Sequence, residues 1–190
     1  MPITHETGSD FDAGGKFLSA EGWYHLVVTS ATDTPTKRDG TIISGAAFRV
    51  DCTVAAGTSP NCQDKQCDIT FFAPKASSKD GGEFSRKVID RAFLAMNAID
   101  PTGKNKTVSI EATDLVGQQF IAKFSKDDKY LSLDGANIYH VDDPEVKDQP
   151  KNEAVLNIID EKHRLIGSRT RADVPQTAEP VAASVEDMDI

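Results

Sequence analysis

The sequence predicts a mainly β domain in which one helix interrupts a run of five strands. Two observations lead to this prediction. Segments rich in β-branched and aromatic residues alternate with clusters of Pro, Asp, Gly and Asn, which is typical of short strands joined by turns. A single segment inside this run has apolar residues at helical spacing, and it falls between the third and fourth strands.

The first three strands are expected at 22–31, 41–55 and 67–73. The turn cluster "TDTPTKRDG" separates the first two, and the loop "AGTSPNCQDKQ" separates the second from the third. In the second strand Phe48 and Arg49 fall on opposite faces, because successive strand residues alternate. The short connections predict an antiparallel meander.

The helix is expected within "GGEFSRKVIDRAFLAMNAID". Ile89, Phe93 and Met96 follow the i, i+4, i+7 rule of an amphipathic helix. Ser85 is the expected N-cap, and Pro101 is expected to end the helix.

A short strand at 106–112, a longer one at 114–126 and a last one at 130–141 complete the expected set. Five principal strands with a helix between the third and fourth are the elements of an OB-type Greek-key barrel. We therefore predict a flexible N-terminus at 1–16 and an OB-fold domain at 17–146. A linker and helix at 147–167 and a disordered acidic tail at 168–190 are expected to follow.

The charge of the chain is unevenly distributed. The formal net charge is −9, but residues 1–140 hold 15 basic and 18 acidic groups, whereas residues 141–190 hold 6 basic and 12 acidic groups. Nucleic-acid-binding domains are usually basic, so the overall charge speaks against that function. The concentration of negative charge in the last quarter of the chain weakens the objection.

No pattern indicates catalysis, a membrane span or secretion. The four histidines are scattered, and the sequence lacks the phosphate-loop, Gly-x-Ser-x-Gly and His-Glu-x-x-His motifs. We expect a cytoplasmic protein without a cofactor that is not an enzyme. Cys52, Cys62 and Cys67 leave a zinc site open as an alternative, although three reduced thiols near one hairpin explain them as well.

Adjacent Phe71 and Phe72 must point to opposite faces of their strand, so one ring is covered by another segment or is used in binding. Single-strand binding needs aromatic faces for base stacking and cations that follow the phosphates. The sequence supplies aromatic residues on outward strand faces, and it places cations at the strand ends and at the start of the helix. The predicted nucleic-acid-binding residues are Trp23, Lys37, Arg38, Arg49, Phe72, Lys75, Lys79, Arg86, Lys123, Lys126 and Tyr130.

The segments "EGWYHLVVTSATDTPTKRDGTIISGAAFRV", "FFAP" and "DLVGQQFIAKFSKDDKYLSLDGANIYHVDDPE" resemble phage-type OB-fold single-stranded DNA-binding proteins. The resemblance covers about residues 17–146. It includes a Leu-x-Gly-x-x-Phe entry to the fourth strand and a Tyr-x-x-Leu fifth strand. It implies cooperative coating of single strands in replication, recombination or repair, with neither catalysis nor a metal.

The acidic tip, with Glu186, Asp187, Met188, Asp189 and Ile190, is the predicted partner-binding segment. The resemblance implies recruitment of replication or recombination proteins there, but this tail ends in Ile190 where bacterial-type relatives end in Pro-Phe. The pattern itself also fits a solubilising tail, or a tail that lies back on the cationic surface. The preference for DNA or RNA and self-association are left open.

The sequence thus favours sequence-independent single-stranded DNA binding by base stacking and phosphate contacts. The alternative is a non-enzymatic β-barrel module that binds proteins or belongs to a virion. That alternative accounts directly for the negative charge.

Deletion of residues 168–190 is expected to tighten binding to single-stranded oligonucleotides at low salt, because the acidic tail would compete with phosphates for the cations. Fluorescence anisotropy of the full chain and the truncated chain measures this effect. Equal affinities would show that the tail does not compete.

Overall fold

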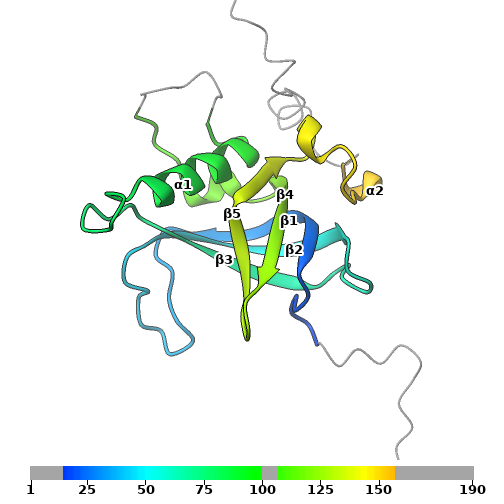
Figure 1. Cartoon of the computed structure of the whole chain (residues 1–190), viewed down its shortest axis with the longest axis horizontal. Helices are drawn as coiled ribbons and strands as arrows, with labels where there is room; N and C mark the ends of the chain where they lie inside the picture. The colour runs from blue at the N-terminus through cyan, green and yellow to red at the C-terminus, as the bar shows by residue number, and fades with distance from the viewer. Residues whose placement is uncertain (1–14, 100–106, 157–190) are drawn as a thin grey trace, which may run out of the picture.

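The computed structural model describes residues 15–99 and 107–156 (Figure 1). The strands are β1 (Gly22–Thr32), β2 (Ala46–Gly57), β3 (Gln66–Phe72), β4 (Gln119–Lys126) and β5 (Leu131–His140). The helices are α1 (Glu83–Ala95) and α2 (Glu153–Leu156), with 3₁₀ turns η1 (Ala112–Leu115) and η2 (Pro144–Val146).

The five strands form one strongly curled antiparallel sheet in the order β3-β2-β1-β4-β5. Helix α1 follows β3 and packs against β5, β3 and β4 at one end of the sheet (Figure 1). This arrangement is an OB-like β half-barrel and confirms the predicted fold class. The barrel is open on one side, because β3 and β5 are the two edges of the sheet and do not pair with each other.

The inner face of the sheet is the main core, and its residues alternate along most of the strand length as the sequence predicts, with register shifts in the β1–β2 and β4–β5 pairs. Tyr24, Leu26 and Val28 of β1 are fully buried, and Phe120, Ala122 and Phe124 of β4 lie beside them. Burying a large apolar side chain contributes about 1.5–3 kcal/mol, so this face supplies most of the stability.

A second apolar cluster lies on the opposite face of β1 and β4. Ile121 packs there with Val141, Val146 and Leu156, and Trp23 and Tyr139 pack against this group. The chain after β5 therefore folds back and covers part of the outer face of the sheet. We call residues 141–156 the covering segment.

The local boundaries differ from the sequence expectations in three places. Helix α1 begins at Glu83, and its N-terminus is stabilised by Asp80, whose carboxylate accepts hydrogen bonds from the N–H groups of Gly82 and Phe84. Ser85 is thus inside the first turn and is not the cap. The helix ends at Ala95, before the turn at Met96, so it does not continue to Pro101, which lies outside the described residues.

The short strand expected at 106–112 is absent from its described part, 107–112. The chain there is irregular and leads into η1 at Ala112. The expectations for 1–14 and for the tail at 168–190 fall outside the described residues. Only 153–156 of the expected C-terminal helix is described, and the domain boundaries stay predictions. Within the described part of the chain, no helix has the length and hydropathy to cross a membrane.

Two histidines, the buried His25 and the largely buried His140, join the covering segment to the sheet. The Nδ1 atom of His25 accepts a hydrogen bond from the backbone N–H of Asn152 at 3.1 Å, and its Nε2 lies 2.8 Å from Oε1 of Gln119. His140 accepts from the N–H of Asp142 at 3.1 Å. Because each Nδ1 is an acceptor, both imidazoles are held in the neutral form.

Stability is expected to fall on acidification because burial lowers the pKa of both histidines. For His140 the pKa falls to about 4, with nearby Lys151 adding to the effect. An unfolded chain takes up these protons near pH 6.5, before the folded chain does. The His140 contribution is present above pH 6.5 and should decrease by about 2 kcal/mol between pH 7 and pH 5.

Urea unfolding at these two pH values measures the loss, and an NMR titration of the imidazole signals gives the pKa values directly. A folded-state pKa near 6.5 for His140 would contradict the prediction.

Candidate nucleic-acid interface

Three of the predicted cations line one large hollow on the open part of the surface. The hollow has a volume of about 830 Å³ and lies between the β1–β2 loop, the outer face of β2 and the start of β3. Lys37 and Arg38 come from the loop and are exposed, whereas Arg49 comes from β2. The structure thus brings together residues that are 12 positions apart in the chain.

Arg49 is already held by protein groups. Its Nε lies 3.2 Å from a carboxylate oxygen of Asp51, and its Nη1 donates to the backbone oxygen of Thr36 at 3.1 Å. Asp51 also accepts a hydrogen bond from the hydroxyl of Ser30 at 2.6 Å. Arg49 therefore stabilises the β1–β2 loop, and the exposed cations available to a phosphate in this hollow are Lys37 and Arg38.

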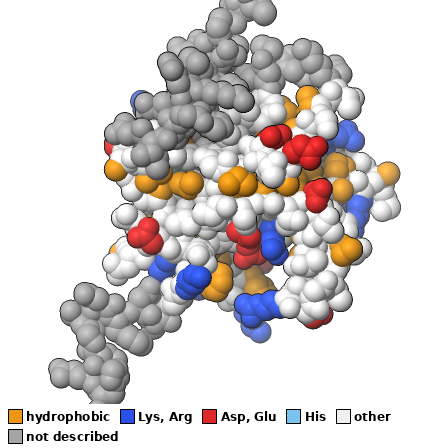
Figure 2. Space-filling view, turned by 180° about the vertical axis from the view of Figure 1, so that it is seen from behind, with side chains coloured by type: hydrophobic (Ala, Val, Ile, Leu, Met, Phe, Trp, Pro, Cys, Tyr) orange, Lys and Arg blue, Asp and Glu red, His pale blue; other side chains and the backbone are white. Residues whose placement is uncertain are grey.

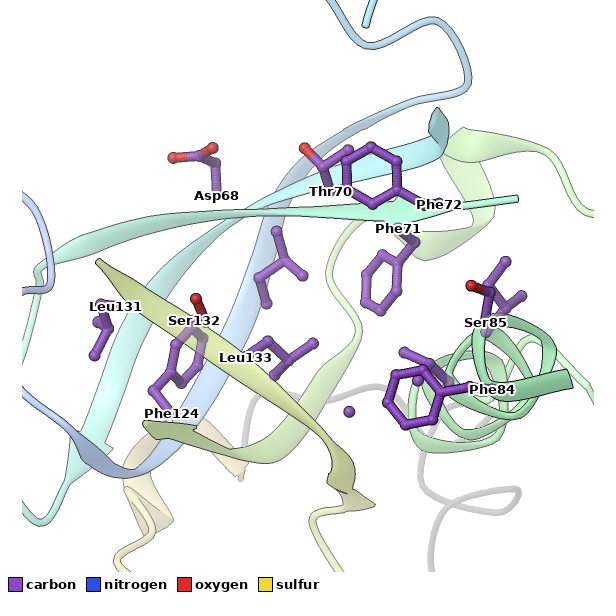
Figure 3. Close-up of a pocket in the computed structure, with 14 residues that line it drawn as sticks. Asp68, Thr70, Phe71, Phe72, Phe84, Ser85, Phe124, Leu131, Ser132 and Leu133 are labelled. Carbon is purple, nitrogen blue, oxygen red and sulfur yellow. The ribbon is translucent and has the colours of Figure 1, made fainter. Parts of the chain in front are cut away.

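Phe72 lies at the end of β3 and is 48% exposed, while Phe71 beside it is buried. This arrangement confirms that the two adjacent rings point to opposite sides. Phe72 also borders a second cavity of about 390 Å³ between β3, α1 and β5. Figure 3 shows Phe72 directed away from the interior of this cavity, with Phe71 and Phe84 directed into it.

Further predicted cations lie in the loop after β3 and at the start of α1. The side chain of Lys75 runs over Gly45, where an added Cβ would come within 3.2 Å of Nζ. This contact brings the loop after β3 to the end of the β1–β2 loop. Lys79 and Arg86 are also exposed, so the predicted cations of this region all reach solvent.

The β4–β5 hairpin borders both hollows. Leu131 lines each of them, as do Asp68 and Phe124, so the two hollows adjoin. The predicted residues Lys126 and Tyr130 are in this hairpin, and Tyr130 is 75% exposed. The loop cations, Phe72 and the hairpin thus border one open surface along the edge of β3, which we call the open face.

Trp23 and Lys123 are placed elsewhere. They are cross-strand neighbours on β1 and β4, and both are half-buried. The ring of Trp23 lies 6.1 Å from that of Tyr139 in the cluster beneath the covering segment. The structure therefore does not bring these two predicted residues to the open face.

Seen from behind the view of Figure 1, the described surface has Lys and Arg side chains interspersed with Asp and Glu and no continuous basic stripe (Figure 2). Within the larger hollow, Asp51 and Asp68 lie beside the cations. Sequence reasoning did not include these carboxylates, which reduce the local positive potential. It also missed Phe84, which is 59% exposed at the mouth of the smaller cavity.

The signal for Phe84 was present in the sequence, because Phe84 and Val88 are one helical turn apart and both line the cavity. The preceding glycines made this stretch appear to be only a helix start. The sequence does not show which strands the first turn of this helix faces, because that depends on tertiary structure.

The cysteines are buried within the fold. Cys52 and Cys67 are directly opposite on β2 and β3, and their contact and burial raise the pKa of Cys52 well above its usual value. Cys62 is also buried and unbonded to another cysteine. In the residues described, no group of three or more His, Cys, Asp or Glu side chains has an arrangement for holding a metal ion.

The fold places the chain in the class of OB-like β half-barrels. Comparison with known proteins adds no narrower assignment, because neither a family model nor a curated protein matches the sequence.

Truncation of Trp23 is expected to cost more folding stability than truncation of Phe72. Trp23→Ala should lower the free energy of unfolding by about 2 kcal/mol, because it leaves a gap beneath the covering segment. Phe72→Ala should cost less than about 1 kcal/mol, because its ring is half exposed. Urea unfolding of both variants tests this difference, and equal losses would contradict the placement of Trp23.

Proposed function

We propose that the protein binds single-stranded DNA without strong sequence preference, and that the open face is the binding surface. The observation that carries the proposal is an exposed aromatic ring, Phe72, at a strand end with exposed cations nearby. Bases stack on aromatic rings with about 1–3 kcal/mol per base, whatever their identity. The exposed cations Lys37, Arg38, Lys75 and Arg86 would contact the phosphates.

The structure refines the residue set of this proposal. Trp23 and Lys123 are left out because the covering segment packs over that part of the sheet. Arg49 is assigned a positioning role, since its guanidinium is held by Asp51 and Thr36. Phe84 is added as a second exposed ring that lines the same cavity as Phe72.

The alternative is a protein-interaction or virion-associated module, and the acidic side chains Asp51 and Asp68 in the larger hollow favour it. The two functions differ in how binding depends on salt. Each phosphate contact on a single strand gives a slope of about −0.7 in a plot of log affinity against log salt concentration.

Anisotropy of a labelled oligo-dT at two salt concentrations tests the proposal. Binding should weaken at the higher salt, and Phe72→Ala should weaken it about 5- to 100-fold through the lost stacking. Val116→Ala is a matched control, because Val116 is an exposed apolar residue, 43% accessible, that lies between η1 and β4 and does not line either hollow. No binding at low salt would reject the proposal in favour of the protein-interaction module.

A further inference from the structure

The gap between β3 and β5 is bounded at both ends. At the start of β3, Gln66 exchanges backbone hydrogen bonds with Lys16 and Leu18 on the side away from β2. At the other end, Nη1 of Arg91 donates to the backbone oxygen of Gly135, and a side chain at Gly135 would overlap Val88 of α1. The 390 Å³ cavity lies between these two closures.

The backbone groups that border this cavity point into the gap. Because Gln66 bonds away from β2 and alternate residues of an antiparallel strand bond on the same side, the N–H and C=O groups of Asp68 and Thr70 also face the gap. At the β4–β5 turn, Asp127 and Tyr130 exchange backbone hydrogen bonds, which fixes which residues of β5 bond toward β4. The backbone groups of Leu131 and Leu133 therefore point away from β4 and into the gap from the β5 edge.

The walls of the cavity are largely apolar and include a rigid aromatic surface, and its polar lining residues are Asp68, Thr70, Ser85 and Ser132. Phe71 is stacked on Phe48 with ring centroids 4.5 Å apart, and Phe48 is stacked on Phe93 at 4.9 Å. This stack fixes the ring of Phe71. Figure 3 shows Phe84 directed into the cavity from α1, with Leu133 and Phe124 on the side of the β4–β5 hairpin.

We infer that the cavity between β3 and β5 is a pocket for one unstacked nucleobase of the bound strand. The inference rests on the proposed function and deepens it. A base has two flat apolar faces and an edge of hydrogen-bond donors and acceptors. The cavity offers aromatic and aliphatic walls together with strand-edge N–H and C=O groups, and its volume suits a small planar ligand.

The surroundings favour a nucleotide over a strand-like peptide, which can also pair with free strand edges. Phe72 provides a stacking surface directly outside the pocket. Lys75 is exposed on the loop after β3, three residues beyond Phe72, where a phosphate next to an inserted base would pass. A strand-like peptide would have no need of this cation.

Intermolecular NOEs provide a test on the wild-type protein, which needs no variant to fold. With oligo-dT bound, the thymine methyl protons should show NOEs to the methyl groups of Ile69, Val88 and Leu133. These three residues line the pocket.

A variant adds an affinity measurement. Val88→Phe fills the pocket and should weaken oligo-dT binding about tenfold through the lost contacts of one base. Leu94→Phe adds similar bulk to the same helix away from the pocket and should leave affinity unchanged.

Salt-dependent oligo-dT binding without NOEs to the pocket methyls, and unaffected by Val88→Phe, would overturn the pocket and leave the proposed function standing. Absence of any oligonucleotide binding at low salt, with a strand-like apolar peptide bound in the cavity, would overturn both.

Discussion

The burial of β1 on both faces and its pairing along both edges is the constraint on which the rest of the molecule depends. It pairs with β2 on one side and with β4 on the other. Tyr24, Leu26 and Val28 project into the main core, while His25 on the opposite face is held by the covering segment. Because one strand serves two clusters, loss of packing on either face weakens the sheet order that forms the half-barrel.

This double burial divides the outer surface into a covered part and an open part. The covering segment packs on the outer surface of β1 and β4, where Trp23 contacts Tyr139. The open face remains along β3, and the edge of β3 beyond Gln66 does not pair with β5 because β5 is held by α1 instead. The Arg91 to Gly135 hydrogen bond and the close approach of Val88 keep β5 turned toward the helix. The candidate site and the incomplete closure of the barrel therefore have the same structural origin.

The features predictable from the sequence are those set by local alternation. The inward direction of Tyr24, Leu26 and Val28 and the opposite directions of Phe71 and Phe72 follow from the two-residue period of strands. The covering of Trp23 was not predictable, because it depends on a segment more than 100 positions away in the chain. The pairing of Arg49 with Asp51 follows the same two-residue period, whereas the hydrogen bond from Arg49 to Thr36 forms only after the β1–β2 loop has folded.

The acidic net charge is a weaker argument against strand binding than it first appears. At physiological ionic strength, exposed charges are screened beyond about 8 Å, so a distant acidic group hardly affects a phosphate at the open face. The carboxylates that matter are those within the hollow, and Asp51 is already partly neutralised by Arg49. With few unpaired cations beside Asp68, phosphate contacts alone would give weak binding. Stacking on Phe72 and insertion of a base beside Phe84 would then supply much of the affinity. A protein of this kind would depend more on aromatic contacts, and less on salt, than a basic single-strand binder of the same size.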